Sequence, residues 1–191
     1  MEQNFATVLK TACEGCNVCP LAYKSKRVKP LLYVNADAVV SEAKFLAIGH
    51  TLPHVGMKAP TSYNAKVQNE AHKDLADIFG ETWMQDGEVI YTNAVRCPSP
   101  DATKDSFVDL LESCRQWNIL LRESFKVVIL IGPSAQKQML GEKAEKLVDG
   151  EIVSSSSLNT LILPLKPVEL RTDEDVRKYK RQIKKLKEKM L

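Results

Sequence analysis

The sequence predicts an α/β fold built around a mainly parallel central sheet. Two observations carry this prediction: short apolar runs alternate with segments of helical periodicity, and each run leads into a loop marked by Gly or Pro. The chain has 191 residues. That length suits one domain with a full hydrophobic core better than two. We therefore expect a single domain over residues 1–191, with a cysteine-rich segment at 1–30 and a basic helix at 172–190.

The expected elements alternate along the chain. Strands are expected at 44–48, 88–93, 126–131, 151–153 and 159–163. Helices are expected at 4–12, 68–79, 104–124, 134–141 and 172–190, with Ser134 as a cap and Thr172 beginning the last. The stretches 49–66 and 154–157 are expected to be irregular, because the first is rich in breakers and the second is a run of serines.

The carboxyl ends of the strands are the expected location of a functional site. Ligands of open parallel sheets bind at that edge. In this sequence the strand ends are expected at Gly49, Asn93, Gly132 and Pro164. Side chains in the loops that follow these positions are therefore the first candidates for binding or catalysis.

Composition excludes several classes of protein. A hydrophobic content of 44% is too high for a disordered chain, and five cysteines are too few for a disulfide-stapled secreted scaffold. The N-terminus lacks the basic start and apolar stretch of a signal peptide, and no apolar run is long enough to span a bilayer. We expect an intracellular protein that is neither secreted nor membrane-bound, with reduced cysteines.

The cysteines have the spacing of metal ligands. Cys16 and Cys19 form a CxxC turn, and Cys97 and Cys114 are separated by sixteen residues. Four thiolates are the set required by a 4Fe–4S cluster or by structural zinc. Cys13 forms an overlapping CxxC and is the alternate ligand. Two other interpretations stay open: Cys114 is an ordinary buried helix cysteine, or the three N-terminal cysteines serve another metal or a redox disulfide.

The order of these features resembles the iron–sulfur uracil-DNA glycosylases, family 4, with family 5 close by. The resemblance covers about residues 13–190. It is carried by these segments: Cys16–Leu21, Phe45–Gly49, Tyr91–Cys97, Cys114, Val127–Ala135 and Leu163–Arg171. It implies a three-layer sandwich, a 4Fe–4S cluster on Cys16, Cys19, Cys97 and Cys114 in preference to zinc, and an enzyme that flips a base out of DNA and hydrolyses its N-glycosidic bond.

The resemblance also implies the site residues. Asn93 matches the asparagine that reads the base edge, since its amide both donates and accepts hydrogen bonds. Gly49, Pro53 and His54 belong to the substrate-binding loop after the first strand. His50 stands where the family has an acidic residue, and Lys166 stands where the family has a histidine. These two are the candidate catalytic residues.

Other catalytic positions depart from the family pattern. The stacking aromatic has no counterpart in register, with Tyr63 nearby and Val67 at the aligned position, and Asp101 stands near the place of an expected asparagine. Three interpretations follow: an active glycosylase with altered chemistry or base preference, a silent relative that keeps the DNA-binding or partner-binding scaffold, or an enzyme acting on another modified base. In the third, a lysine with a lowered pKa attacks the sugar covalently.

Charge is concentrated at the C-terminus. Between Arg171 and Leu191 nine Lys or Arg face four acids, a net +5, while the whole chain carries +3. A second basic run lies at 24–29. These segments are expected to bind the phosphate backbone of DNA without reading its sequence. The alternative is an ordinary solvated lysine-rich helix face.

Overall fold

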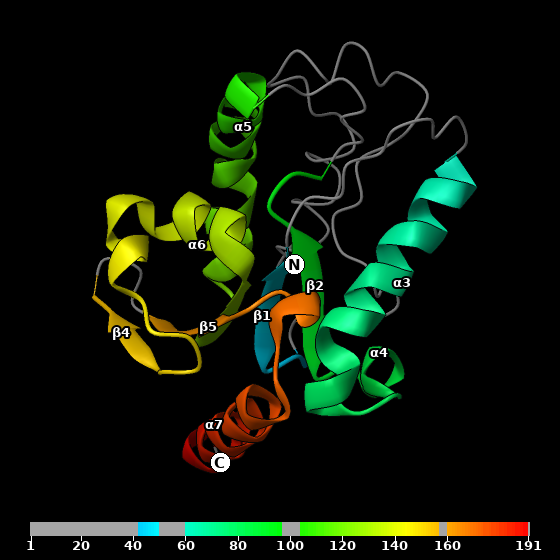
Figure 1. Cartoon of the computed structure of the whole chain (residues 1–191), viewed down its shortest axis with the longest axis vertical. Coiled ribbons are helices and arrows are strands. Elements are labelled where there is room, and N and C mark those ends of the chain that lie inside the picture. The colour runs from blue at the N-terminus through cyan, green and yellow to red at the C-terminus, as the bar shows by residue number, and fades with distance from the viewer. Residues whose placement is uncertain (1–41, 50–59, 97–103, 157–159, 191) are drawn as a thin grey trace, which may run out of the picture.

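The computed structural model describes residues 42–49, 60–96, 104–156 and 160–190 (Figure 1). Five strands form one sheet in the order β2-β1-β3-β5-β4. They are β1 (Phe45–Gly49), β2 (Val89–Asn93), β3 (Val127–Ile131), β4 (Val153–Ser155) and β5 (Thr160–Leu165). Strands β2, β1, β3 and β5 are parallel, and β4 is antiparallel to β5. The predicted α/β class with a mainly parallel sheet is confirmed.

Helices cover both faces of this sheet. The described helices are α3 (Pro60–Phe79), α4 (Trp83–Asp86), α5 (Lys104–Arg122), α6 (Gly132–Leu140) and α7 (Asp173–Met190), with 3₁₀ turns η1 (Gly141–Lys146) and η2 (Val168–Leu170). Helices α3, α4 and α7 pack on one face, and α5 and α6 pack on the other. Figure 1 shows β1 and β2 between α3 on one side and α5 and α6 on the other.

The strands form because both of their faces are apolar. Every residue of β1, β2 and β3 is buried. Successive side chains point to opposite faces, so Leu46 and Ile48 pack with α5 and α6 while Phe45 and Ala47 pack with α3 and α7. Continuous apolar runs of this kind are typical of parallel strands covered on both sides.

The last two strands differ from expectation. β5 continues through Pro164 to Leu165, although proline is expected to end it. Pro164 is tolerated because the ladder of β4 ends at Ile162, so the missing N–H falls on a side where β4 no longer pairs. β4 spans Val153–Ser155, so the expected strand at 151–153 is shifted by two residues and the expected serine-rich turn is partly strand.

The described helices confirm the helical periodicity, but α3 and α6 begin at other residues than expected. α3 begins at Pro60, so the expected irregular stretch 49–66 is wrong from 60 onward; proline is well tolerated in the first turn of a helix. α6 begins at Gly132, with Ile131 as its N-cap residue, so Ser134 is not the cap. α5 ends at Arg122, two residues early. The expected helix at 4–12 lies outside the described residues.

Among the described residues, no helix combines the length and apolar character needed to cross a bilayer.

Candidate functional site

The carboxyl ends of β1 and β2 lie side by side. Gly49 and Asn93 are register partners on these adjacent parallel strands, and the N–H of Ala94 donates to the carbonyl of Gly49 at 2.9 Å. β3 and β5 end at the same edge, at Ile131 and Leu165. The predicted strand ends therefore meet, and the two candidate binding residues Gly49 and Asn93 are brought together. We call this edge the carboxyl-edge site.

Gly49 makes room for a tyrosine. A Cβ built on Gly49 would lie 1.7 Å from the hydroxyl oxygen of Tyr91 and 2.4 Å from its Cζ. Both distances are far below any van der Waals contact. The Tyr91 ring, which is 2% exposed, therefore packs directly against the backbone of Gly49. Any side chain at Gly49 would expel it.

The Tyr91 hydroxyl donates a 2.6 Å hydrogen bond to the carboxylate of Asp74 on α3. Burial raises the pKa of Asp74 from 3.8 to about 6, an effect that the Tyr91 hydrogen bond and the nearby Arg171 charge only partly oppose. Burial, together with Asp74, also raises the pKa of Tyr91 well above its ordinary value. Near neutral pH the carboxyl therefore exchanges a proton readily while the phenol stays protonated.

Arg171 ties the segment after β5 to α3. Its side chain is 2% exposed; Nη1 donates to the peptide oxygen of Asp74 at 2.6 Å and to the Asp77 carboxylate at 3.0 Å. Its Nε donates to the carbonyl of Lys166 at 2.8 Å. The guanidinium also lies 5.8 Å from the centroid of the Tyr179 ring. The positive charge is thus paired with Asp77 and not with the carboxylate of Asp74.

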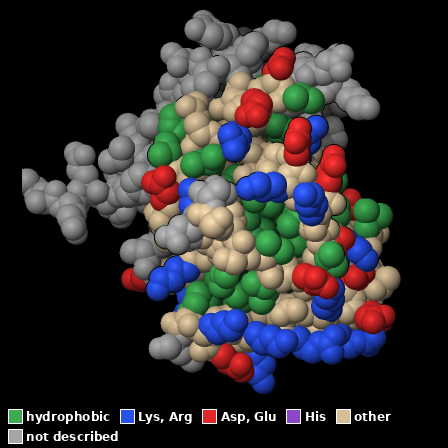
Figure 2. Space-filling model, turned by 90° about the vertical axis from the view of Figure 1, so that its left-hand side faces the viewer, with side chains coloured by type: hydrophobic (Ala, Val, Ile, Leu, Met, Phe, Trp, Pro, Cys, Tyr) green, Lys and Arg blue, Asp and Glu red, His purple; other side chains and the backbone are tan. Residues whose placement is uncertain are grey.

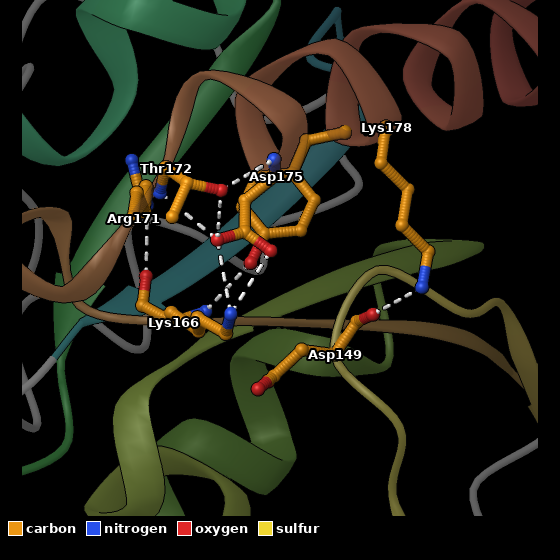
Figure 3. Close-up of polar contacts among 7 residues, drawn as sticks. Asp149, Lys166, Arg171, Thr172, Asp175 and Lys178 are labelled. Carbon is orange, nitrogen blue, oxygen red and sulfur yellow. Dashed lines mark hydrogen bonds and ion pairs between the residues drawn. The ribbon is translucent and has the colours of Figure 1, made fainter.

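Lys166, a candidate catalytic residue, is held by an ion pair at the N-terminus of α7. Its Nζ lies 2.9 and 3.0 Å from the two carboxylate oxygens of Asp175 (Figure 3). Its backbone N–H donates to the Tyr179 hydroxyl at 3.2 Å. The hydrogen bond that Lys166 donates to Asp175 raises the pKa of Lys166, whereas a nucleophilic lysine needs a lowered pKa.

Behind Asn93 lies a buried polar network between β2, α5 and α6. The Asn118 side-chain amide donates to the carbonyl of Asn93 at 3.2 Å and to the Gln138 side chain at 2.7 Å. Gln138 donates in turn to the carbonyls of Ala94 at 2.6 Å and Leu111 at 2.8 Å. Asn118 is fully buried and Gln138 nearly so. This network fixes the backbone at the end of β2.

The same network holds Arg96, the last described residue before Cys97. The Arg96 guanidinium is 1% exposed and donates to the Thr92 hydroxyl and to the Asn118 side chain. Asn118 stands one helical turn after Cys114 on α5. The end of β2 is therefore fastened to α5 close to the fourth predicted ligand.

Of the predicted metal ligands, the structure describes Cys114, which is 7% exposed on α5. Cys13, Cys16, Cys19 and Cys97 lie outside the described residues. Within the part of the chain that the structure describes, no group of three or more His, Cys, Asp or Glu side chains is arranged to hold a metal. The predicted cluster stays a prediction.

Other predicted residues also lie outside the described ranges. They are His50, Pro53, His54 and the basic run 24–29. Asn93 is 5% exposed, and among the described residues nothing hydrogen-bonds to its side-chain amide.

The outer face of α7 carries a row of cations. Six are exposed and make no ion pair with described residues: Arg177, Lys180, Arg181, Lys184, Lys185 and Lys189. The inner face, with Tyr179, Ile183 and Leu186, is buried against the sheet. Figure 2 shows a band of Lys and Arg side chains along its lower edge, the level at which Figure 1 places α7. We call the six residues the α7 basic face.

Sequence reasoning missed Asp74, Tyr91 and Arg171 as parts of the site. A signal for Asp74 is present, since it lies three residues after Ala71 and four before Ile78, both buried. A carboxylate on the apolar stripe of a helix indicates a buried partner. Nothing in the sequence indicates that Arg171 reaches α3. Comparison with protein-family models and with curated proteins finds no match to this sequence.

Proposed function

We propose that this protein binds DNA through the α7 basic face and takes a flipped nucleotide at the carboxyl-edge site, as a uracil-DNA glycosylase-like protein that excises uracil or a modified base. The observation that carries the proposal is the α7 basic face. From Val176 to Lys187 the helix contains no acid, and its inner face is committed to the core. The outer cations are therefore available to an external polyanion.

The spacing of these cations suits a phosphate backbone. Residues three or four apart on a helix surface are about 5–6 Å apart, so Arg177, Lys180 or Arg181, and Lys184 or Lys185 form a rising row. α7 begins beside Lys166 at the carboxyl-edge site, and Lys187 pairs with Glu88 just before β2 at the opposite edge. DNA lying along α7 would thus pass the site at one end.

Asn93 is the proposed reader of the base. Asn93 is the register partner of Gly49, and the Asn118 side chain donates to the backbone carbonyl of Asn93. A side chain that both donates and accepts is suited to the edge of a pyrimidine. His50, Pro53 and His54 would complete the binding loop, and His50 and Lys166 remain the proposed catalytic pair on the basis of the family resemblance.

A 4Fe–4S cluster on Cys16, Cys19, Cys97 and Cys114 is part of the proposal, with zinc as the second choice. Cys114 fits such a role, since its thiol is buried beside the network that anchors the end of β2. The cluster would brace the N-terminal segment and the β2 loop against α5. Cys114→Ala is expected to lose iron and the brown visible absorption, while Cys13→Ala keeps both. A colourless zinc-loaded wild type would contradict iron–sulfur, and loss of iron in Cys13→Ala would make Cys13 a ligand.

The second candidate function is a catalytically silent DNA-binding or partner-binding module. The ion pair between Lys166 and Asp175 favours it, because the ammonium must leave a two-oxygen partner before it can reach a substrate. The two functions share the DNA interface and differ in whether base excision occurs.

A binding titration tests the DNA interface that the two candidate functions share. Wild type and Lys180→Glu/Lys184→Glu are titrated by fluorescence anisotropy against single- and double-stranded oligonucleotides carrying uracil or modified bases. Because two phosphate contacts become repulsive, we expect at least about a tenfold weaker affinity and a shallower salt dependence. Lys143→Glu/Lys146→Glu, with exposed lysines on η1, is the matched control. Equal affinity of the α7 variant and the control would contradict the interface.

The same oligonucleotides are then assayed for abasic sites. Wild type is expected to produce them, and Asn93→Ala, His50→Ala and Lys166→Ala to produce fewer. DNA binding without any abasic sites would establish the silent module. Equal cleavage by wild type and all three variants would show that the site residues are wrong.

A further inference from the structure

Asp74 is a carboxylate from α3 that reaches the carboxyl-edge site. Its Oδ2 accepts the hydrogen bond from Tyr91, whose hydroxyl in turn touches the backbone of Gly49. Tyr91 and Asn93 point to the same face of β2, about 6–7 Å apart. Asp74 therefore stands beside the residue proposed to read the base.

One oxygen of Asp74, Oδ2, is held by the Tyr91 hydroxyl. The side chain is only partly exposed, and among the described residues no donor bonds to Oδ1. A partly exposed carboxylate oriented by one hydrogen bond has the geometry of a group that takes a proton from water.

Among the described residues, no cation bonds to the carboxylate of Asp74. On its own helix Glu70 stands one turn away, and Asp77 pairs with Arg171. Tyr91 faces it from β2, and Arg171 and Glu169 face it from the segment between β5 and α7. Arg171 binds the peptide oxygen of Asp74. Burial raises the pKa of the Asp74 carboxyl to about 6 and so keeps it easily protonated, although the Tyr91 hydrogen bond and the Arg171 charge lower that pKa.

We infer that Asp74 is the general base of the carboxyl-edge site, with Tyr91 as its positioning residue, in an enzyme that hydrolyses an N-glycosidic bond. The inference rests on the proposed glycosylase function. The water oxygen forms a bond to the anomeric carbon as the carbon–nitrogen bond breaks. The bonding electron pair leaves with the base, and the water proton passes to Asp74. The departing base anion then takes a proton from solvent.

Asp74 supplies what the sequence lacks after β1, where His50 replaces an acidic residue. Lys166 cannot take this role in its observed state, because it is a cation bound to Asp175. A carboxylate is also the better base for water attack on a carbon that develops positive charge, because its own charge stabilises that carbon.

The test is single-turnover excision measured against pH on the best oligonucleotide substrate. Wild-type rate is expected to rise with pH through about 6, where Asp74 loses its proton. Asp74→Asn should lower the rate by about 10²–10⁴-fold, and Asp74→Glu should recover part of it. Tyr91→Phe removes a hydrogen bond that lowers the pKa of Asp74, so the inflection should move to higher pH. Asp109→Asn, an exposed carboxylate on α5, is the control.

The outcomes separate this inference from the proposed function. If wild type excises a base and Asp74→Asn does so equally well, the general-base role is overturned and the glycosylase function stands. If wild type excises no base from any oligonucleotide, both are overturned. Thermal melts of each variant test for misfolding, and Asp74→Asn should melt at no lower a temperature than wild type. Asp74→Glu keeps the carboxylate charge, so its excision rate is a second test of the general-base role.

Discussion

The hydroxyl of Tyr91 occupies the space that a side chain on Gly49 would fill. A Cβ at position 49 would lie 1.7 Å from the hydroxyl oxygen, so there is no room for even a methyl group. This contact joins the ends of β1 and β2 and directs the Tyr91 hydroxyl toward Asp74. Its consequences reach α3, which packs on the same face of the sheet as α7, while α5 and α6 cover the opposite face.

Gly49→Ala should destabilise the protein by about 1–3 kcal/mol or more, because the Tyr91 ring must move out of a close-packed core. In a Tyr91→Leu background the same change should cost much less, since the shorter side chain vacates the space. Urea denaturation of the four proteins in this double-mutant cycle measures the coupling. Equal costs of Gly49→Ala in the two backgrounds would contradict the contact.

Asp74→Asn should stabilise the protein at neutral pH. The pKa of Asp74 is about 6 in the folded protein, against an ordinary value of 3.8. The free energy of unfolding therefore falls as pH rises from about 4 to about 6, and the whole loss of stability is present above that range. The gain at pH 8 should be roughly 2–3 kcal/mol and should vanish below pH about 4.

Urea melts at pH 4 and pH 8 measure this difference. Asp109→Asn, on the exposed face of α5, should stay within about 0.5 kcal/mol of wild type at both pH values. If Asp74→Asn instead lowers the free energy of unfolding at pH 8, the carboxylate stabilises the fold through Tyr91, and its burial does not destabilise the protein.

Gln138→Met should cost on the order of 2–3 kcal/mol, because the carbonyls of Ala94 and Leu111 and the amide of Asn118 would lose a buried partner. Lys137→Met is the matched control, with the same new side chain at the neighbouring exposed position. Chemical denaturation followed by circular dichroism compares the two. Similar effects of both changes would mean that the network adds no stability at the end of β2.

Thr172→Ala should cost about 1 kcal/mol, because Thr172 caps α7: its hydroxyl accepts from the N–H of Asp175 at 3.2 Å. Thr172→Ser keeps the hydroxyl and should be close to wild type. In return, the backbone N–H of Thr172 and the ammonium of Lys166 lower the pKa of Asp175 from 3.8 to about 2.

The Asp175 carboxylate therefore stabilises the fold above pH about 4, and this contribution is lost as pH falls toward 2. Asp175→Asn should be less stable than wild type at pH 7, and the gap should narrow between pH 4 and pH 2. Acid titration of the free energy of unfolding measures it. A gap that stays constant across this range would exclude a role for the carboxylate charge.

The sequence identified most of the framework. Apolar runs located β1, β2 and β3, and helical periodicity located α5 and α7, because burial repeats with the period of the local structure. The sequence also placed Gly49 and Asn93 at the carboxyl ends of strands, and the structure confirms that they lie side by side at that edge. The sequence pattern missed the first turns of α3, because a proline such as Pro60 is found at the start of a helix as well as in loops.

By itself, then, the sequence determined the α/β class, the edge where a site should lie and the basic character of the last helix. Only the tertiary structure decided which polar groups lie at that edge. Asp74 meets Tyr91 across 17 residues and Arg171 across 97, and Lys166 is drawn to Asp175. Periodicity records which face of an element is buried, whereas these partners are set by how separate elements pack, which no local pattern encodes.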